Sequence, residues 1–102
     1  MSIQKRYLKS RPVCKVTFRV EDKEKKDADK VEILGDFNDW TAGSTVMDQL
    51  KDGTFKATVE LEPEREYAFR YLIDEEIWEN DGEADKFVPT EYGDAENSVI
   101  VV

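Results

Sequence analysis

The sequence predicts an all-β protein, an immunoglobulin-like antiparallel β-sandwich of about six to eight strands. Three observations support this fold class. Apolar and polar side chains alternate in several short stretches, turn-forming residues separate these stretches, and no stretch carries the apolar stripe of an amphipathic helix. The length of 102 residues suits one domain. We expect a basic N-terminal arm over residues 1–12 and a single sandwich domain over residues 13–102.

The alternation of apolar and polar residues places the expected strands along the chain. The first, residues 13–20, puts Cys14, Val16, Phe18 and Val20 on one face and polar side chains on the other. Residues 54–61 and 67–73 alternate in the same way, and further short strands are expected at residues 31–34, 87–88 and the β-branched stretch 98–102. Between them, residues 21–30 are densely charged and predict a solvated hairpin loop or a helical turn. Residues 35–53 are loop-like, and residues 74–85 form an acidic connector.

The charge of the chain is acidic overall but unevenly distributed. The formal net charge is −9, from 24 acidic and 15 basic residues, yet residues 1–20 contain six bases and no acid. The acidic remainder argues against nucleic acid and anionic membranes as partners, because both attract proteins through basic groups. The basic start is either an interaction arm or, more simply, a solvated strand edge or frayed tail.

The scarcity of histidine and cysteine excludes several kinds of chemistry. The chain has no histidine, which is the most common general base and transition-metal ligand, and its one cysteine is Cys14. We therefore expect no metal site, no cofactor and no intrachain disulfide, in a cytoplasmic protein. Residues 81–85 place acids at alternate positions, but the glycine and the later acid of a calcium loop are absent, so we expect a solvated acidic loop. No secretory signal or membrane span is expected.

Two motifs contain the candidate binding residues. The first, Gly-Asp-Phe-Asn-Asp-Trp at residues 35–40, follows a strand, and we expect Gly35 to permit a turn there and Phe37 to point inward. Trp40 then either packs over the sandwich edge or forms an exposed aromatic platform. The second motif, residues 67–74, puts three aromatic side chains on one face, so Arg70 points the other way. Trp78 follows it as either a core or rim tryptophan or a second platform.

These motifs, in this order, resemble one family of proteins. The chain is similar to the family-48 carbohydrate-binding modules in the segments G-D-F-N-D-W, D-G-T-F-K-A-T-V-E-L, E-Y-A-F-R-Y-L-I-D with Trp78, and E-N-S-V-I-V-V. This family includes the glycogen-binding domain of AMP-activated protein kinase beta subunits and the N-terminal domains of isoamylases and glycogen branching enzymes. The resemblance covers residues 13–102 and is strongest to stand-alone bacterial members, the isoamylase early set proteins.

The resemblance implies a function and a set of binding residues. It implies non-catalytic binding of α-1,4-linked glucans such as glycogen, starch and maltooligosaccharides. By motif match, the carbohydrate-binding residues are Trp40, Arg70, Trp78 and Asn97, with Arg70 where the family has lysine. The turn before Trp78 (residues 74–78) is one residue longer than the family's and lacks its glycine. Asp81-Gly82 replaces the family's Asp-Pro, and the loop at residues 89–96 also differs.

Two other functions compete with glucan binding. A glycosidase needs two carboxylates facing each other across a cleft, and a domain of this size has little room for one. The alternative function is a protein-interaction or regulatory module that docks on a glucan-metabolising enzyme without binding sugar itself. The exposure of Trp40 and Trp78 distinguishes the two, because a sugar platform needs both side chains accessible and the interaction module leaves them buried.

Overall fold

The computed structural model describes residues 1–21, 28–90 and 95–102. Within them, its strands are β1 (Ser2–Tyr7), β2 (Cys14–Val20), β3 (Val31–Gly35), β4 (Asp48–Gln49), β5 (Phe55–Leu61), β6 (Glu66–Ile73), β7 (Ile77–Glu79), β8 (Lys86–Pro89) and β9 (Glu96–Val101). A single turn of 3₁₀ helix, η1 (Asp36–Asn38), follows β3. No helix in these described parts of the chain is long and apolar enough to cross a membrane.

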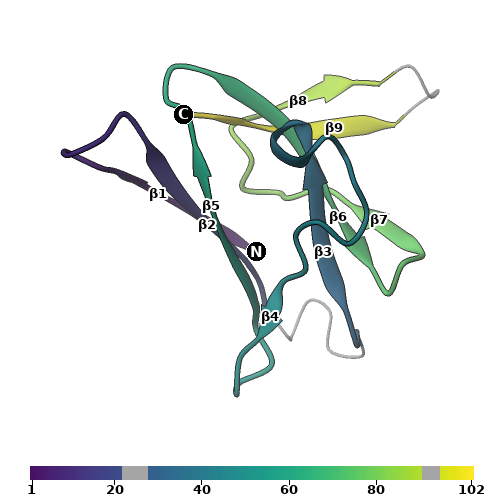
Figure 1. Ribbon diagram of the computed structural model, residues 1–102. Helices are drawn as coiled ribbons and strands as arrows, with labels where there is room; N and C mark the ends of the chain where they lie inside the picture. Colours follow the sequence, from purple (N-terminus) through teal and green to yellow (C-terminus); the bar gives the residue numbers. More distant parts are fainter. Residues whose placement is uncertain (22–27, 91–94) are drawn as a thin grey trace.

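The strands form two facing sheets (Figure 1). The first has the order β1-β2-β5-β4 and the second has the order β3-β6-β9-β8, with β7 paired to β6 beside this path. Neighbouring strands in both sheets are antiparallel. This arrangement confirms the predicted all-β sandwich.

Aromatic side chains fill the space between the two sheets. Phe18 of β2 is fully buried, and its ring centroid lies 5.1 Å from that of Phe69 and 6.5 Å from that of Tyr71, both on β6. The inward positions of both strands are buried as the alternation predicts: Cys14, Val16, Phe18 and Val20, and Tyr67, Phe69, Tyr71 and Ile73. Because β6 alternates strictly, its intervening residues face outward on the second sheet, and these include Arg70.

Three strands lie outside the stretches that the sequence predicts as strands. These are β1 within the basic start, β4 within the loop-like region and β7 within the acidic connector. All three are largely solvent-exposed, so burial imposes no apolar–polar alternation on their sequences. The expected charged hairpin loop at residues 21–30 lies mostly outside the described residues, since residues 22–27 are not among them.

The strand β1 forms an edge of the first sheet and is tied to the second sheet by Lys5. Its whole length pairs with β2. Lys5 Nζ donates hydrogen bonds of 2.7 Å to Asp85 Oδ2 and to the Val101 carbonyl oxygen. Residues 2–7 of the basic start therefore form an edge strand that is paired along its length on one side. The Lys5 side chain reaches from this edge to the second sheet.

Candidate functional site

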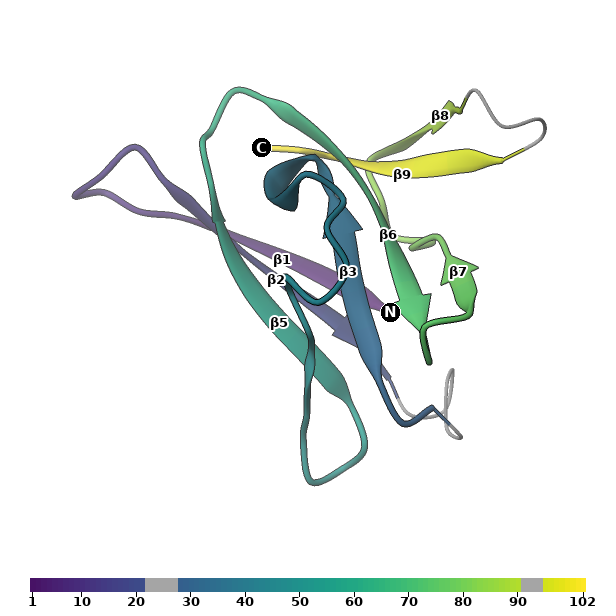
Figure 2. The same cartoon turned by 45° about the vertical axis from the view of Figure 1, so that its right-hand side comes forward.

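Arg70 lies on the outer face of the second sheet, where one edge of β6 changes its partner. That edge pairs with β9 as far as Phe69 and Ser98, and with β7 from Tyr71 and Glu79 onward. Arg70 is the residue between these two pairings. The strands β7 and β9 therefore diverge beside it, and Figure 2 shows β7 next to β6 and apart from β9.

A group of hydrogen bonds joins β7 to β9 at this divergence. Asn80, which follows β7, accepts at Oδ1 from the Ser98 backbone N–H at 3.0 Å and from its hydroxyl at 2.8 Å. Asn80 Nδ2 donates to the Glu96 carbonyl oxygen at 2.9 Å. The Asp81 N–H donates to Ser98 Oγ at 2.9 Å. Since Ser98 is fully buried, these bonds fix the ends of both strands around Arg70.

Asp81 is a buried carboxylate, which corrects the expectation of a wholly solvated acidic loop. Its side chain is 0% exposed, with Oδ2 accepting from the Tyr71 hydroxyl at 2.7 Å and Oδ1 accepting from the Glu83 N–H at 2.8 Å. The neighbouring Gly82, Glu83 and Asp85 are exposed, as expected. The burial of Asp81 depends on a hydroxyl from another strand, so no pattern within the loop reveals it.

Trp78 stands on β7 with a large part of its surface in solvent. It pairs with Leu72 of β6 and remains 45% exposed. The Cζ atom of Arg70 lies 5.0 Å from the centroid of its ring, within the range of a cation–π contact. Of the alternatives left open by the sequence, the structure excludes a core position for this tryptophan.

Trp40 reaches the same guanidinium from the turn that follows β3. Asp39 and Trp40 have positive φ angles of 54° and 55°, which reverse the chain after η1. Asp36 holds the indole in place, because its Oδ1 accepts from Trp40 Nε1 at 3.0 Å while its Oδ2 accepts from the Ala68 N–H of β6 at 2.8 Å. The indole N–H is thus engaged, and the partly exposed Trp40 has its ring surface to offer a ligand.

Gly35 is required for space rather than for the turn that the sequence suggested. Its φ of −170° is extended backbone that any residue adopts. A Cβ atom at this position would lie 2.5 Å from the Ala68 carbonyl oxygen and 2.8 Å from Phe69 Cβ. The turn itself is fixed by Asn38, whose Oδ1 accepts from the Gly35 N–H and whose Nδ2 donates to the Ile33 carbonyl oxygen, both at 3.0 Å.

Arg70 lies between the two indole rings. Its Cζ atom is 5.9 Å from the centroid of the Trp40 ring and 5.0 Å from that of the Trp78 ring. Its Nε atom is buried and finds no hydrogen-bond partner among the residues that the structure describes. The structure thus brings together three of the four residues that the resemblance implies.

Asn97, the fourth of these residues, lies near the start of β9. The pairing of Phe69 with Ser98, continued by one step, puts Asn97 opposite Arg70 on the outer face. Its Oδ1 atom is buried and also has no hydrogen-bond partner within the described part of the chain. Buried polar atoms are normally paired, so two unpaired atoms close in the pairing register are an unusual feature of this face.

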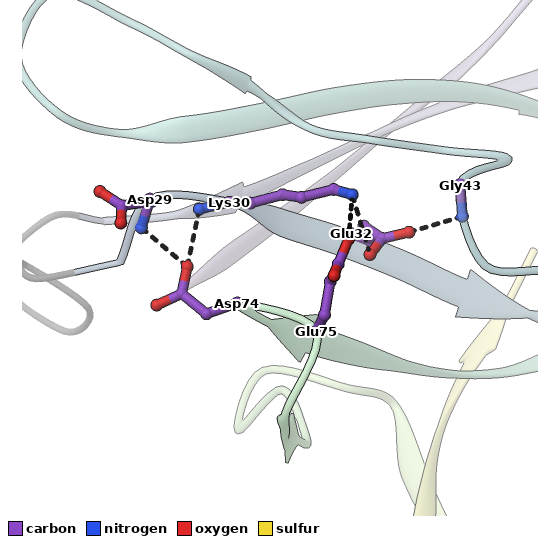
Figure 3. Close-up of polar contacts among 6 residues, drawn as sticks. All are labelled: Asp29, Lys30, Glu32, Gly43, Asp74 and Glu75. Atoms are coloured by element: carbon purple, nitrogen blue, oxygen red, sulfur yellow. Dashed lines mark hydrogen bonds and ion pairs between the residues drawn. The ribbon is translucent and has the colours of Figure 1, made fainter.

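The hairpin before β7 is held by a cluster of charged residues (Figure 3). Asp74 and Glu75 have positive φ angles of 51° and 61°, in the turn where the family has a glycine. Asp74 Oδ1 accepts from the N–H groups of Asp29 and Lys30 at 2.8 and 2.9 Å, and Lys30 Nζ donates to Glu75 Oε1 at 2.7 Å. That last bond lowers the pKa of Glu75 and raises the pKa of Lys30. These bonds offset the backbone strain and so position Trp78.

Glu32 connects this hairpin to the loop that follows Trp40. Its side chain lies on the outer face of β3 and is almost completely buried. Oε1 accepts from the Gly43 N–H at 2.6 Å, and Oε2 lies 3.7 Å from Lys30 Nζ, the amino group that also binds Glu75 (Figure 3). One buried carboxylate therefore links the two segments that carry the tryptophans.

An open depression of about 430 Å³ adjoins Arg70 and Trp78. Its other lining residues come from the end of β7, from β8 and from the start of β9: Asn80, Phe87, Ala95 and Glu96. Trp40 and Asn97 are not among them. Sequence reasoning did not find Asn80, Phe87 or Glu96. An exposed phenylalanine in a short strand has the same local pattern as a core one, and the two polar residues lie in ordinary charged segments. Part of the differing loop at residues 89–96, residues 91–94, lies outside the described residues.

The side chains of this face have the chemistry of carbohydrate recognition. Two indole rings contact one guanidinium, and the pairing register puts an asparagine next to it on the sheet. Among the described residues, no group of three or more Asp, Glu, His or Cys is placed to hold a metal ion. A β-sandwich with such an aromatic surface has the features of a carbohydrate-binding module.

Comparison with known proteins identifies the family. The model of carbohydrate-binding module 48, the isoamylase N-terminal domain, matches residues 25–88. The chain belongs to this family, whose matched range here includes Trp40, Arg70 and Trp78 and ends before Asn97. No curated protein matches the chain.

Proposed function

We propose that this protein binds α-1,4-linked glucans, such as glycogen, starch and maltooligosaccharides, without acting on them chemically. The observation that carries the proposal is that the guanidinium of Arg70 lies within cation–π range of both Trp40 and Trp78, which brings two partly exposed indoles to one face. Membership of a carbohydrate-binding family supports a sugar as the ligand. The exposure of Trp78 favours this function over the interaction module, which would bury it.

The chemistry of a glucose unit fits these groups. A pyranose has an apolar C–H face and a rim of hydroxyls, and an indole ring offers it a flat apolar surface with little conformational entropy to lose. The guanidinium of Arg70 and the amide of Asn97, both on partly exposed side chains, supply hydrogen-bonding groups for the hydroxyls. An α-1,4 chain curves, so two indoles on different elements select for that curve. An open site of this kind implies a Kd of roughly 10 µM to 1 mM, or about −4 to −7 kcal/mol.

The lining of the depression supports a role in binding rather than catalysis. Glycoside hydrolysis by the usual route requires two carboxylates on either side of the scissile bond. Of the lining residues that the structure describes, Glu96 alone carries a carboxylate. We also propose a cytoplasmic location, because Cys14 is a free, buried thiol and a reducing compartment keeps it so.

Isothermal titration with maltoheptaose and β-cyclodextrin tests the proposed function. We expect the wild type to bind in the stated range and Trp78→Ala to abolish the heat, while circular dichroism shows that the variant remains folded. Tyr7→Ala is the matched control, since Tyr7 is an exposed aromatic residue (55%) on the opposite sheet. Stacking on uncharged sugar should change little with salt concentration.

The absence of heat at millimolar sugar, from folded wild-type protein, would refute glucan binding. Docking on a glucan-metabolising enzyme would then be the leading function. A complex of that kind should weaken as salt is added, because it would rest on the charges of the surface.

A further inference from the structure

We infer that the sugar-binding face continues past Trp78 into a further subsite, formed by Phe87 and Glu96, which takes the next units of the same glucan chain. This subsite rests on the glucan binding proposed above and extends it. It predicts that the protein prefers long linear chains to short ones.

Phe87 supplies an aromatic surface to this subsite. It lies on the edge strand β8 and is 43% exposed, nearly as much as Trp78. Both side chains line the same depression, together with Arg70. The volume of about 430 Å³ falls within the range of roughly 300–1,000 Å³ that is typical of small-molecule sites. A phenylalanine this exposed adds little to the core, so its ring is available to the C–H face of a sugar.

Glu96 supplies hydrogen-bond acceptors to the same subsite. It is exposed at the start of β9 and lines the depression. A carboxylate accepts hydrogen bonds from several hydroxyls at once, which suits the rim of a pyranose. Asn80 has a different part, because its amide is already bonded to Ser98 and to the Glu96 carbonyl. It holds the strand that presents Glu96.

Two other depressions in the described structure have no such combination. One, of about 560 Å³, is lined by Pro12, Val13 and residues 62–64. The other, of about 430 Å³, is lined by Asp29, Lys30 and residues 74–76. Among the described residues, neither is lined by an aromatic side chain. Similar size without an aromatic surface gives no stacking platform, so of these three depressions the one beside Trp78 is suited to a sugar.

The order of the strands sets the direction in which the glucan continues. Trp40 follows β3, Arg70 is on β6, Trp78 is on β7 and Phe87 is on β8, the strand at the far edge of the sheet. Phe87 pairs with Ser98, which also pairs with the core residue Phe69, so the glucan chain reaches Phe87 through the depression shared with Trp78 and not across the outer face of β8. Short oligosaccharides fill the indole pair, and the remaining units of a longer chain reach the edge strand.

Titration of a series of linear sugars, from maltotriose to maltoheptaose, tests the subsite. In the wild type, affinity should keep rising with chain length. Phe87→Ala should lower the affinity for maltoheptaose by about 3- to 10-fold, equivalent to about 0.7–1.4 kcal/mol, and leave that for maltotriose unchanged. Glu96→Ala should also lower the affinity for maltoheptaose, whereas Phe87→Tyr, which keeps an aromatic ring, should retain the rise of affinity with chain length. Tyr7→Ala is the control, because it removes an exposed aromatic ring from an edge strand of the other sheet. Thermal melts check that each variant is folded.

The outcomes separate this inference from the proposed function. If the folded wild type binds none of these sugars, the function and the subsite both fail. If the wild type binds and Trp78→Ala abolishes binding, while Phe87→Ala and Glu96→Ala bind every chain length as the wild type does, the function stands and the subsite is wrong. A loss of equal size for maltotriose and maltoheptaose also contradicts it, because that result places Phe87 within the indole site.

Discussion

The buried bond between Tyr71 and Asp81 makes a sharp prediction about stability. Tyr71→Phe removes the hydroxyl and keeps the ring, whose centroid packs 5.8 Å from that of Phe69 and 6.5 Å from that of Phe18. The change therefore removes the 2.7 Å hydrogen bond to Asp81 Oδ2 and keeps the packing of the ring. A hydrogen bond to a charged group contributes about 1.5–3 kcal/mol, and a buried acceptor that loses its donor costs a similar amount.

Urea denaturation followed by tryptophan fluorescence measures this effect. We expect Tyr71→Phe to lower the free energy of unfolding by about 1.5–3 kcal/mol with an unchanged m-value, and to lower Tm by about 4–8 °C per kcal/mol. Asp81→Asn in the Tyr71→Phe background should cost less than it does in the wild type, because the two groups interact directly. A change below about 0.5 kcal/mol in Tyr71→Phe would show that the bond does not stabilise the fold.

Three further predictions follow from the contacts around the site. Gly35→Ala should lower the free energy of unfolding by about 1–3 kcal/mol or more, since the new Cβ would overlap a backbone oxygen of β6. A variant with the same Tm as the wild type would contradict this close approach. Glu32→Ala should lower the free energy of unfolding by about 1–3 kcal/mol. Glu32→Gln should lower it by less, because the glutamine oxygen still accepts from the Gly43 N–H. An equal loss of stability in the two variants, measured by urea denaturation, would contradict this. Burial opposes ionisation of Asp85, but the bond from Lys5 and a backbone N–H hold its pKa below the ordinary value of 3.8. Ionised Asp85 therefore stabilises the fold fully above its ordinary pKa, and this stabilisation is lost as pH falls through the lower pKa of the folded state. Between about pH 5 and pH 2, the Tm of Asp85→Asn should depend less steeply on pH than that of the wild type.

Alternation along β2 and β6 was sufficient to predict which side chains form the core. Phe18 and Phe69 are buried, and Arg70 faces outward, because each of these strands has one face on the core and a period of two. The positions of Trp40 and Trp78 beside Arg70 came from motif similarity. Periodicity could not give them, since both residues lie outside the regular alternating strands.

The features that the sequence did not reveal depend on contacts between distant segments. Asp81 is buried because Tyr71 donates to it from another strand. Gly35 is required because the backbone of β6 passes too close for a Cβ atom. Glu32 appears in the sequence as one more acid in an alternating strand, and its role follows from Gly43 and Lys30 on either side of it. Charge and turn propensity describe each residue locally and give no information on these neighbours.

The strand β7 pairs with three residues of β6 and stands beside the continuous path of its sheet. An extra residue in the turn at 74–76 therefore leaves β3, β6, β9 and β8 in register with one another. A change in the length or angle of this hairpin would therefore move the tryptophan it carries, while the four strands of the continuous path keep their pairing.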